Sequence, residues 1–301
     1  MRYAAVFLLL APFAYSDVIA DVRAATSQGN LALGDSVIKR YRGERGVTPE
    51  MLEALSWMGR GALKLKQLDK ADAYARETEG LVAVVLKQQP LDSDPHLAIA
   101  LGAAIEVEAQ VLAEQGRRGD AVALLRKQLA AYRGTSIRTR IQKNINLLAL
   151  EGKPAPPLEE SEYVGSKPAT LASLKGKPVL LFFWAHWCGD CKAEEPMIAQ
   201  LRRDYASKGF TVVAPTQRYG YVARGEDATP QQEMKYIDET RRRFYADLLD
   251  VPAPVSEENF KLYGASTTPT LVFIDRRGIV RVYHPGAMTM EELKAAVTAV
   301  L

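Results

Sequence analysis

The sequence predicts a chain of two domains, in which an all-α half precedes an α/β half. Apolar residues recur at helical spacing through residues 21–150, and strand-like alternation is absent there. The apolar run from Val179 to Trp184 predicts a buried strand, and residues 192–205 predict a helix directly after it. The expected domains are therefore a helical domain at 21–151, a stiff proline-rich linker at 152–157, and an α/β domain at 158–301.

The N-terminus has the pattern of an export signal. One positive charge at Arg2 precedes a short apolar stretch, residues 4–14, which is too short to span a bilayer comfortably. Small residues follow it, so we expect a cleavable signal peptide within residues 1–20, cut after Ser16 or Ala20. An uncleaved N-terminal membrane anchor is the alternative. Both place the chain in the periplasm or on another extracytoplasmic face.

The helical domain contains a weak internal echo. Residues 68–73 and 118–123 both resemble the turn and second-helix start of a tetratricopeptide-type hairpin, although their offset is 50 residues and not about 34. Thr48 and Pro49 predict a capped helix start. We expect a degenerate helical-hairpin repeat that offers a groove to a peptide or protein partner. A plain helical bundle packed against the second domain is the alternative.

Cys188 and Cys191 are the only cysteines in the 301 residues, and they stand between the predicted strand and helix. This junction places Cys188 at a helix N-terminus, where backbone N–H groups and the helix dipole stabilise a thiolate, with Cys191 one turn further in. A zinc site would need about four ligands, and the three histidines are scattered. A purely structural disulfide would close a very short loop and stabilise little. The pattern therefore favours a redox-active dithiol.

Longer motifs around the cysteines resemble the thioredoxin fold. The resemblance rests on Phe182–Lys192, Thr267–Asp275, Arg277–Tyr283 and a final helix at 290–301. Three further segments resemble the extracytoplasmic TlpA/ResA-like thiol–disulfide oxidoreductases: Ala155–Leu158, Leu174–Val179 and Cys191–Pro196. The resemblance implies a central mixed sheet flanked by helices, with residues 277–283 leading into an edge strand.

The resemblance also implies a role for each residue of the site. Cys188 would attack a substrate disulfide and Cys191 would resolve the mixed disulfide. Pro269 would be cis and lie against the disulfide, so that the Thr268 backbone can pair with an extended substrate. Trp187 would form an apolar landing surface. The implied partners are protein disulfide substrates and a membrane thiol-relay electron donor, and no cofactor or metal is expected.

The chain departs from cytosolic thioredoxins, which usually carry a buried Asp six residues before the first cysteine. Phe182 occupies that position here. Glu194 lies one helical turn from Cys191 and is therefore the candidate for proton transfer, the alternative being an ordinary solvated helix residue. Gly189 and Asp190 are expected to tune the redox potential, since the Asp190 charge opposes thiolate formation. With no histidine between the cysteines, this predicts a reducing dithiol.

The α/β domain also carries a long excursion at 216–254, with a helix predicted from Thr229-Pro230 to about Tyr245. Arg218, Tyr219 and Tyr221 could form an aromatic and basic rim for a partner, or an ordinary surface loop. His186 is expected to lie in a solvated loop. The run Arg241–Arg243 is expected to be a solvated helix face.

The leading function is an exported thiol–disulfide oxidoreductase that reduces protein disulfides. A thiol peroxidase is one alternative, although Ala185 stands where a peroxidatic Thr-x-x-Cys motif needs threonine. A Cu(I) metallochaperone module with Cys188 and Cys191 as soft ligands is another, although no methionine-rich or Cys/His set accompanies them. The net charge of +3 does not indicate a nucleic-acid partner.

Overall fold

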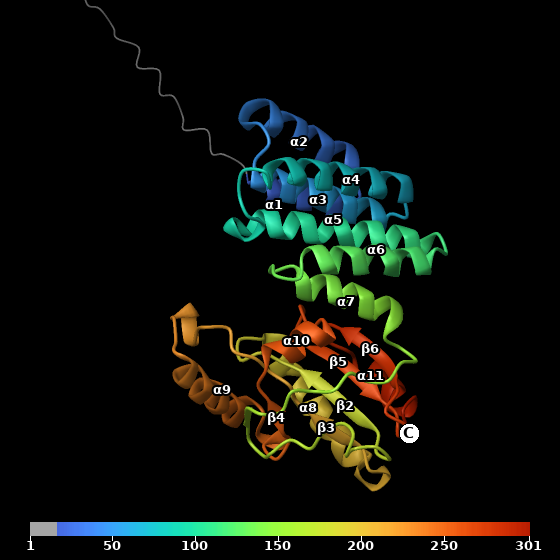
Figure 1. Ribbon diagram of the computed structural model, residues 1–301, viewed down its shortest axis with the longest axis vertical. Coiled ribbons are helices and arrows are strands. Elements are labelled where there is room, and N and C mark those ends of the chain that lie inside the picture. The colour runs from blue at the N-terminus through green and yellow to red at the C-terminus, as the bar shows by residue number, and fades with distance from the viewer. Residues whose placement is uncertain (1–16) are drawn as a thin grey trace, which may run out of the picture. The chain divides into compact units, whose positions relative to one another are not determined.

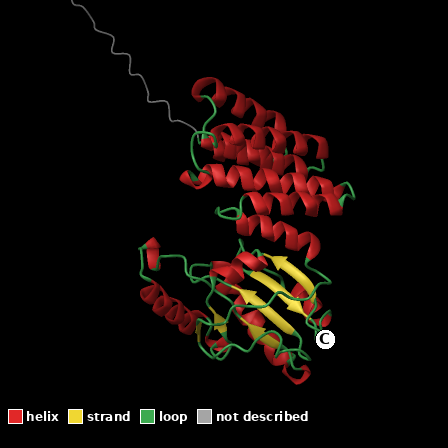
Figure 2. Ribbon diagram, in the orientation of Figure 1, coloured by secondary structure: helices red, strands yellow, loops and turns green. Residues whose placement is uncertain are grey.

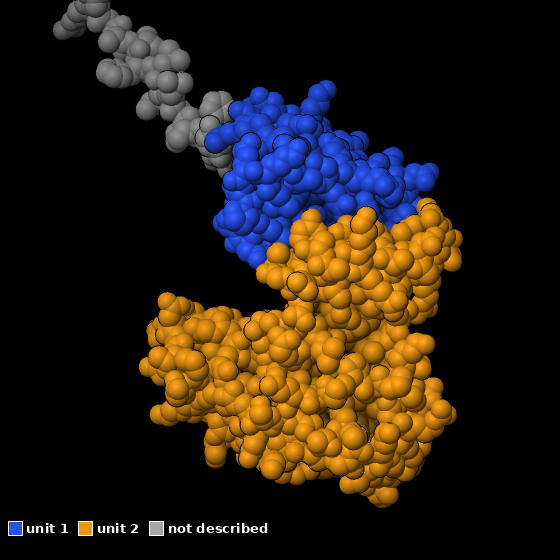
Figure 3. Space-filling view, viewed as in Figure 1, with its two compact units in different colours: residues 1–111 blue, residues 112–301 orange. Residues whose placement is uncertain are grey.

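The computed structural model describes residues 17–301 and divides into two compact units, residues 1–111 and 112–301 (Figure 1, Figure 3). The predicted signal peptide falls mostly on residues 1–16, which lie outside the described part. From Asp17 onward the chain is folded. The Asp17 carboxylate caps the first helix by accepting from the backbone N–H groups of Ile19 and Ala20.

The first unit is helical, as predicted (Figure 2). Its helices are α1 (Val18–Ser27), α2 (Leu31–Arg45), α3 (Pro49–Lys64), α4 (Leu68–Val85) and α5 (Pro95–Glu114), which ends just beyond the unit boundary. Helix α3 begins as expected, with the Thr48 hydroxyl accepting from the backbone N–H of Met51 at 3.2 Å. Helices α4 and α6 (Arg118–Ala131) begin at the two echoed segments. The tetratricopeptide-like character stays a prediction.

Helix α5 is long and apolar enough to cross a membrane. It is the one helix within residues 17–301 that passes this test, and 67% of its most apolar window is buried inside the structure. Burial of this kind is what the core helix of a folded domain shows. Length and composition alone therefore give only weak support for a membrane span here.

The second unit contains the predicted α/β domain. After α6 come α7 (Arg138–Ala149), β1 (Tyr163–Val164), β2 (Val179–Phe183), α8 (Gly189–Asp204), β3 (Thr211–Val213), α9 (Pro230–Phe244), β4 (Ala253–Pro254), α10 (Glu257–Tyr263), β5 (Thr270–Ile274), β6 (Val280–Pro285) and α11 (Met290–Thr298). The main sheet has the order β3-β2-β5-β6, with β2 and β3 parallel and the other pairs antiparallel. The mixed sheet and the edge position of β6 confirm the predicted topology.

Both faces of the sheet are covered, which explains why β2 and β5 are buried at every residue. Leu180 and Phe182 belong to one core cluster, together with apolar residues of α8 and α11. Leu181 and Phe183 point to the opposite face, where Phe260 of α10 packs edge-on against Phe183. The continuous apolar runs of the sequence are those of a sheet buried on both sides.

Helix α7 packs against α10, which places it in the same compact unit as the sheet. Asn146 donates its side-chain amide to the carbonyl of Tyr263 at 2.8 Å. Gly264 ends α10 with φ of +63°, and a Cβ there would lie 2.3 Å from the backbone nitrogen of Lys143. The compact units therefore divide between residues 111 and 112. The linker predicted at 152–157 instead runs along the sheet, since Gly152 N–H donates to the carbonyl of Val280 at 2.8 Å.

Candidate active site at the strand-to-helix turn

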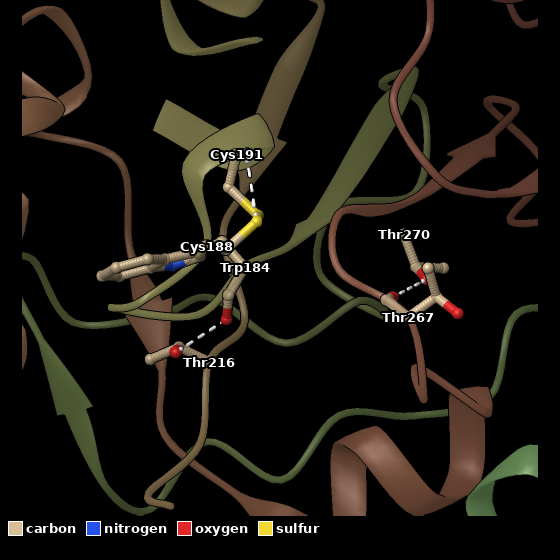
Figure 4. The surroundings of a disulfide bond; sticks show 6 residues. All are labelled: Trp184, Cys188, Cys191, Thr216, Thr267 and Thr270. Atoms are coloured by element: carbon tan, nitrogen blue, oxygen red, sulfur yellow. Dashed lines mark hydrogen bonds between the residues drawn. A yellow bond between two sulfur atoms is a disulfide. The ribbon is translucent and has the colours of Figure 1, made fainter. Parts of the chain in front are cut away.

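The two cysteines form a disulfide at the start of α8 (Figure 4). Cys188 is the N-cap residue, and its Sγ accepts a hydrogen bond from the backbone N–H of Cys191 at 3.0 Å. The helix begins at Gly189, three residues earlier than the sequence predicted. Both cysteines are buried, with Cys188 3% and Cys191 0% exposed. The same N–H that contacts Sγ now would stabilise a Cys188 thiolate after reduction.

The Thr268–Pro269 peptide bond is cis, as the resemblance implies. Its position follows from the sheet register, in which Phe183 at the end of β2 pairs with Thr270 at the start of β5. The turn that leads to the cysteines and the proline loop therefore lie at the same end of two neighbouring strands. The Thr268 hydroxyl is buried and has no hydrogen-bond partner among residues 17–301. Thr270 closes the loop by donating to the carbonyl of Thr267 at 2.6 Å (Figure 4).

The two tryptophans before the cysteines differ in burial. Trp184 is buried, and its indole N–H donates to the carbonyl of Ala214 at 3.0 Å. The Trp184 carbonyl accepts from the Thr216 hydroxyl at 2.9 Å (Figure 4). Trp187, directly before Cys188, is 48% exposed. Trp184 thus packs within the core, and Trp187 presents an aromatic surface beside the disulfide.

Glu194 is buried, with 1% of its surface exposed, so the alternative of a solvated helix residue is wrong. One carboxylate oxygen accepts from the backbone N–H of Met288 at 2.9 Å, and the other has no partner among the described residues. Burial raises the pKa of Glu194 from its ordinary value of 4.5 to about 7, with a smaller contribution from the charge of Asp190. A carboxyl group of this pKa can accept and return a proton near neutral pH.

His186 is not in a solvated loop, contrary to the sequence prediction. It is 1% exposed, and its Nε2 lies 3.1 Å from a carboxylate oxygen of Glu233, which is equally buried. Burial lowers the pKa of His186, against the opposing effect of its hydrogen bond to Glu233. The neutral imidazole therefore donates to the Glu233 carboxylate. Sequence reasoning missed Glu233 because it lies 47 residues further along the chain.

The two ends of the excursion predicted at 216–254 lie side by side, since Thr216 and Val255 form a parallel bridge. Helix α9 begins at Pro230 after a capping box between Thr229 and Gln232, as the Thr-Pro pair predicted. Before α9, Tyr219 packs edge-on against both His186 and Trp187, with ring centroids 5.5 Å apart in each pair. The excursion is therefore in contact with the active-site turn.

The arginine run in α9 is only partly a solvated face. Arg241 is buried, and it donates to the carbonyl of Leu249 at 2.6 Å and pairs with Asp238 at 2.8 Å. Arg242 binds the other oxygen of Asp238, also at 2.8 Å. The helix pattern could not show this, because the partner Leu249 belongs to the segment after α9. Arg241 therefore ties α9 to the segment that follows it within the excursion.

Comparison with known proteins agrees with this geometry. The family of thioredoxin-like domains matches residues 167–301. Thiol:disulfide interchange protein DsbE of Pseudomonas fluorescens is 31% identical over 137 residues, which span 46% of this chain and 67% of that protein. Thiol-disulfide oxidoreductase ResA of Oceanobacillus iheyensis is 34% identical over 134 residues, which span 44% of this chain and 62% of that protein.

Among solved structures, a putative DsbE from Chlorobium tepidum is 28% identical and covers 50% of this chain and 96% of its own, with a TM-score of 0.39. The residues that match the thioredoxin-like family, 167–301, include β2, the two-cysteine turn and the proline loop described above. The helical N-terminal unit lies outside the matched residues 167–301. The chain belongs to the thioredoxin-like thiol–disulfide oxidoreductases of the ResA and DsbE type.

Proposed function

We propose that the protein is an extracytoplasmic reductase of protein disulfides. The observation that carries the direction is the charge around the dithiol. Asp190 lies between the cysteines and Glu194 one turn beyond, while His186 is neutral and bonded to Glu233. Asp190 opposes a thiolate at Cys188, and the hydrogen bond that Cys188 Sγ accepts within the described residues comes from the backbone N–H of Cys191, so we infer that the helix N-terminus is the main source of thiolate stabilisation. A weakly stabilised thiolate makes the dithiol a reductant.

In the proposed cycle, the Cys188 thiolate attacks one sulfur of a substrate disulfide, and the other substrate sulfur leaves as a thiolate. Cys191 then attacks Cys188, which releases the second substrate thiol and forms the Cys188–Cys191 disulfide. Glu194 accepts the proton of the Cys191 thiol in this second step, and its pKa of about 7 supports that role. Trp187, Thr268 and Pro269 bind the substrate segment, and a membrane thiol relay returns two electrons.

The reduction potential of the Cys188–Cys191 couple tests the direction. Equilibration of the purified protein with a dithiothreitol or glutathione series gives the potential directly. A value near or below about −200 mV agrees with a reductase. A value near about −120 mV would reverse the electron flow and overturn the proposal.

Export and the helical domain belong to the same proposal. Cleavage after Ser16 fits the folded part better than cleavage after Ala20, because Asp17 caps α1 and Val18 is buried in the helical core. The first unit also contains a pocket of about 550 Å³ between α1 and α3, in which Trp57 is stacked by Arg23 and Arg60. We propose that this pocket orients an acidic partner segment. Arg23→Glu should then lower partner recovery without changing the reduction potential.

A further inference from the structure

A buried carboxylate, that of Glu233, holds the excursion 216–254 against the active-site turn. Glu233 accepts three hydrogen bonds: from Nε2 of His186 at 3.1 Å, from the backbone N–H of Tyr219 at 2.5 Å, and from the backbone N–H of Gly220 at 2.8 Å. Gly220 has φ of +84°, which favours glycine and lets consecutive N–H groups converge on one carboxylate. Charge-assisted bonds to a buried carboxylate are strong, and removing Glu233 takes this acceptor from the buried His186 ring N–H and from two backbone N–H groups.

This anchor determines where the aromatic rings of the excursion lie. The His186 ring is surrounded edge-on by Tyr219, Tyr221 and Tyr236, with centroid distances of 5.2 to 5.5 Å. Tyr219 continues the cluster to Trp187 at 5.5 Å. Trp187 is covalently adjacent to Cys188, so the cluster ends beside the attacking sulfur. We call Trp187, Tyr219 and Tyr221 the aromatic wall.

We propose that the aromatic wall selects substrates with an apolar side chain next to the reacting cysteine, and that Glu233 is the positioning residue that holds the wall in place. Trp187 is 48% exposed although it is a large aromatic residue, and it directly precedes Cys188 of the disulfide. Tyr219 packs edge-on against the Trp187 ring, with the ring centroids 5.5 Å apart. An extended substrate segment that pairs with the Thr268 backbone would bring its neighbouring side chain onto this surface. The inference rests on the proposed exchange at Cys188, and not on its direction.

Two peptides test the selection. Each carries one cysteine linked to glutathione, flanked by phenylalanine in one and by glycine in the other, and glutathione disulfide serves as a small third probe. The Cys188 thiolate attacks the peptide sulfur and glutathione leaves. Cys191 then releases the peptide thiol and closes the disulfide, so that the probe gains the two electrons that the dithiol loses. The measured quantity is the ratio of second-order rate constants for the phenylalanine and glycine peptides with reduced protein.

We expect the wild-type protein to prefer the phenylalanine peptide about tenfold, as partial burial of one aromatic side chain would give. Glu233→Ala should bring the ratio to within about twofold of one, while its rate with glutathione disulfide and its reduction potential stay at wild-type values. Tyr219→Ala should have the same effect. Glu239→Ala removes a carboxylate of the same helix that is exposed and paired only with Lys235, and it should keep the wild-type ratio.

The wild-type protein showing no preference would overturn the inference. So would a Glu233→Ala protein that loses stability but keeps the preference, because Glu233 would then support the fold alone. If Glu233→Ala does not fold, Tyr219→Ala decides the matter, since it leaves the carboxylate and both backbone N–H groups in place. A shift of the reduction potential in Tyr219→Ala away from the wild-type value would also contradict the inference. The substitution would then act on the dithiol itself and not on substrate selection.

Discussion

Glu194→Gln isolates the proton-transfer step. Glutamine keeps an oxygen that can accept from the backbone N–H of Met288, so the contact at 2.9 Å can persist while the titration is lost. The pKa of Glu194 is about 7, against an ordinary value of 4.5. We therefore expect resolution of the mixed disulfide by wild-type protein to accelerate as pH rises through about 7 and then to level off. Glu194→Gln should lose this transition and resolve at least tenfold more slowly at neutral pH, as loss of a general base predicts.

Glu194→Gln should also change how the free energy of unfolding depends on pH. A carboxyl group whose pKa is raised in the folded state binds its proton more tightly there than in the unfolded chain. Its contribution to the free energy of unfolding is therefore fully present below pH 4.5 and decreases as pH rises from about 4.5 to 7. Each pKa unit corresponds to about 1.4 kcal/mol, so the rise from 4.5 to about 7 should make Glu194→Gln more stable than wild type by about 3 kcal/mol at pH 8.

Rapid-mixing kinetics of reduced protein with a disulfide-linked peptide, followed from pH 5 to 9, measure the mixed disulfide directly. Glu195→Gln is the matched control. Glu195 is also buried with its pKa raised by burial, but it accepts from the backbone N–H of Asp247 at 3.2 Å. An unchanged pH profile in Glu194→Gln, or an equal loss in Glu195→Gln, would refute the assignment. Urea unfolding at pH 5 and 8 provides the independent check on stability.

Two further predictions concern the cysteines and the packing of α7. Cys191→Ser should accumulate mixed disulfides with cell-envelope proteins, whereas Cys188→Ser should accumulate none, as non-reducing electrophoresis and mass spectrometry would show; equal trapping by both would contradict the assigned order of attack. Gly264→Ala should lower the free energy of unfolding by at least about 2 kcal/mol, since its backbone has φ of +63° and the new Cβ would meet the Lys143 backbone at 2.3 Å. Gly119→Ala, with nothing within 4 Å, should not destabilise in thermal unfolding.

Local patterns predicted much of the fold and the dithiol. The apolar run before Cys188 gave β2 nearly to the residue, and Thr229-Pro230 marked the start of α9, because both signals depend on neighbours in the sequence. The edge strand and the cis bond before Pro269 came through resemblance, and both are present. Residue spacing also singled out Glu194, although one helical turn from Cys191 could not tell a buried carboxylate from a solvated one.

The errors concern residues whose partners are distant in sequence. His186 was expected in solvent, yet it is buried and contacts Glu233, which lies 47 residues further along the chain. Arg241 looked like part of a solvated run, yet it reaches the carbonyl of Leu249 in a segment without regular pattern. The compact units divide near residue 111 because α7 packs against α10, and the domain boundary at the prolines of 152–157 stays a prediction. The burial of a polar residue cannot be predicted from its neighbours in the sequence when its partners are distant along the chain.

Glu233 and Glu194, two buried carboxylates near the dithiol, differ in the number of hydrogen bonds that they accept. Glu233 has three donors, two of them backbone groups that cannot leave without moving the excursion. Its charge is satisfied in one arrangement, which suits a residue that holds other groups in place. Glu194 has one donor and one oxygen without a partner among the described residues, and burial raises its pKa to about 7. Because neither of its protonation states is strongly favoured near pH 7, Glu194 suits the proton transfer proposed for Cys191, whereas Glu233 suits the positioning role proposed for it.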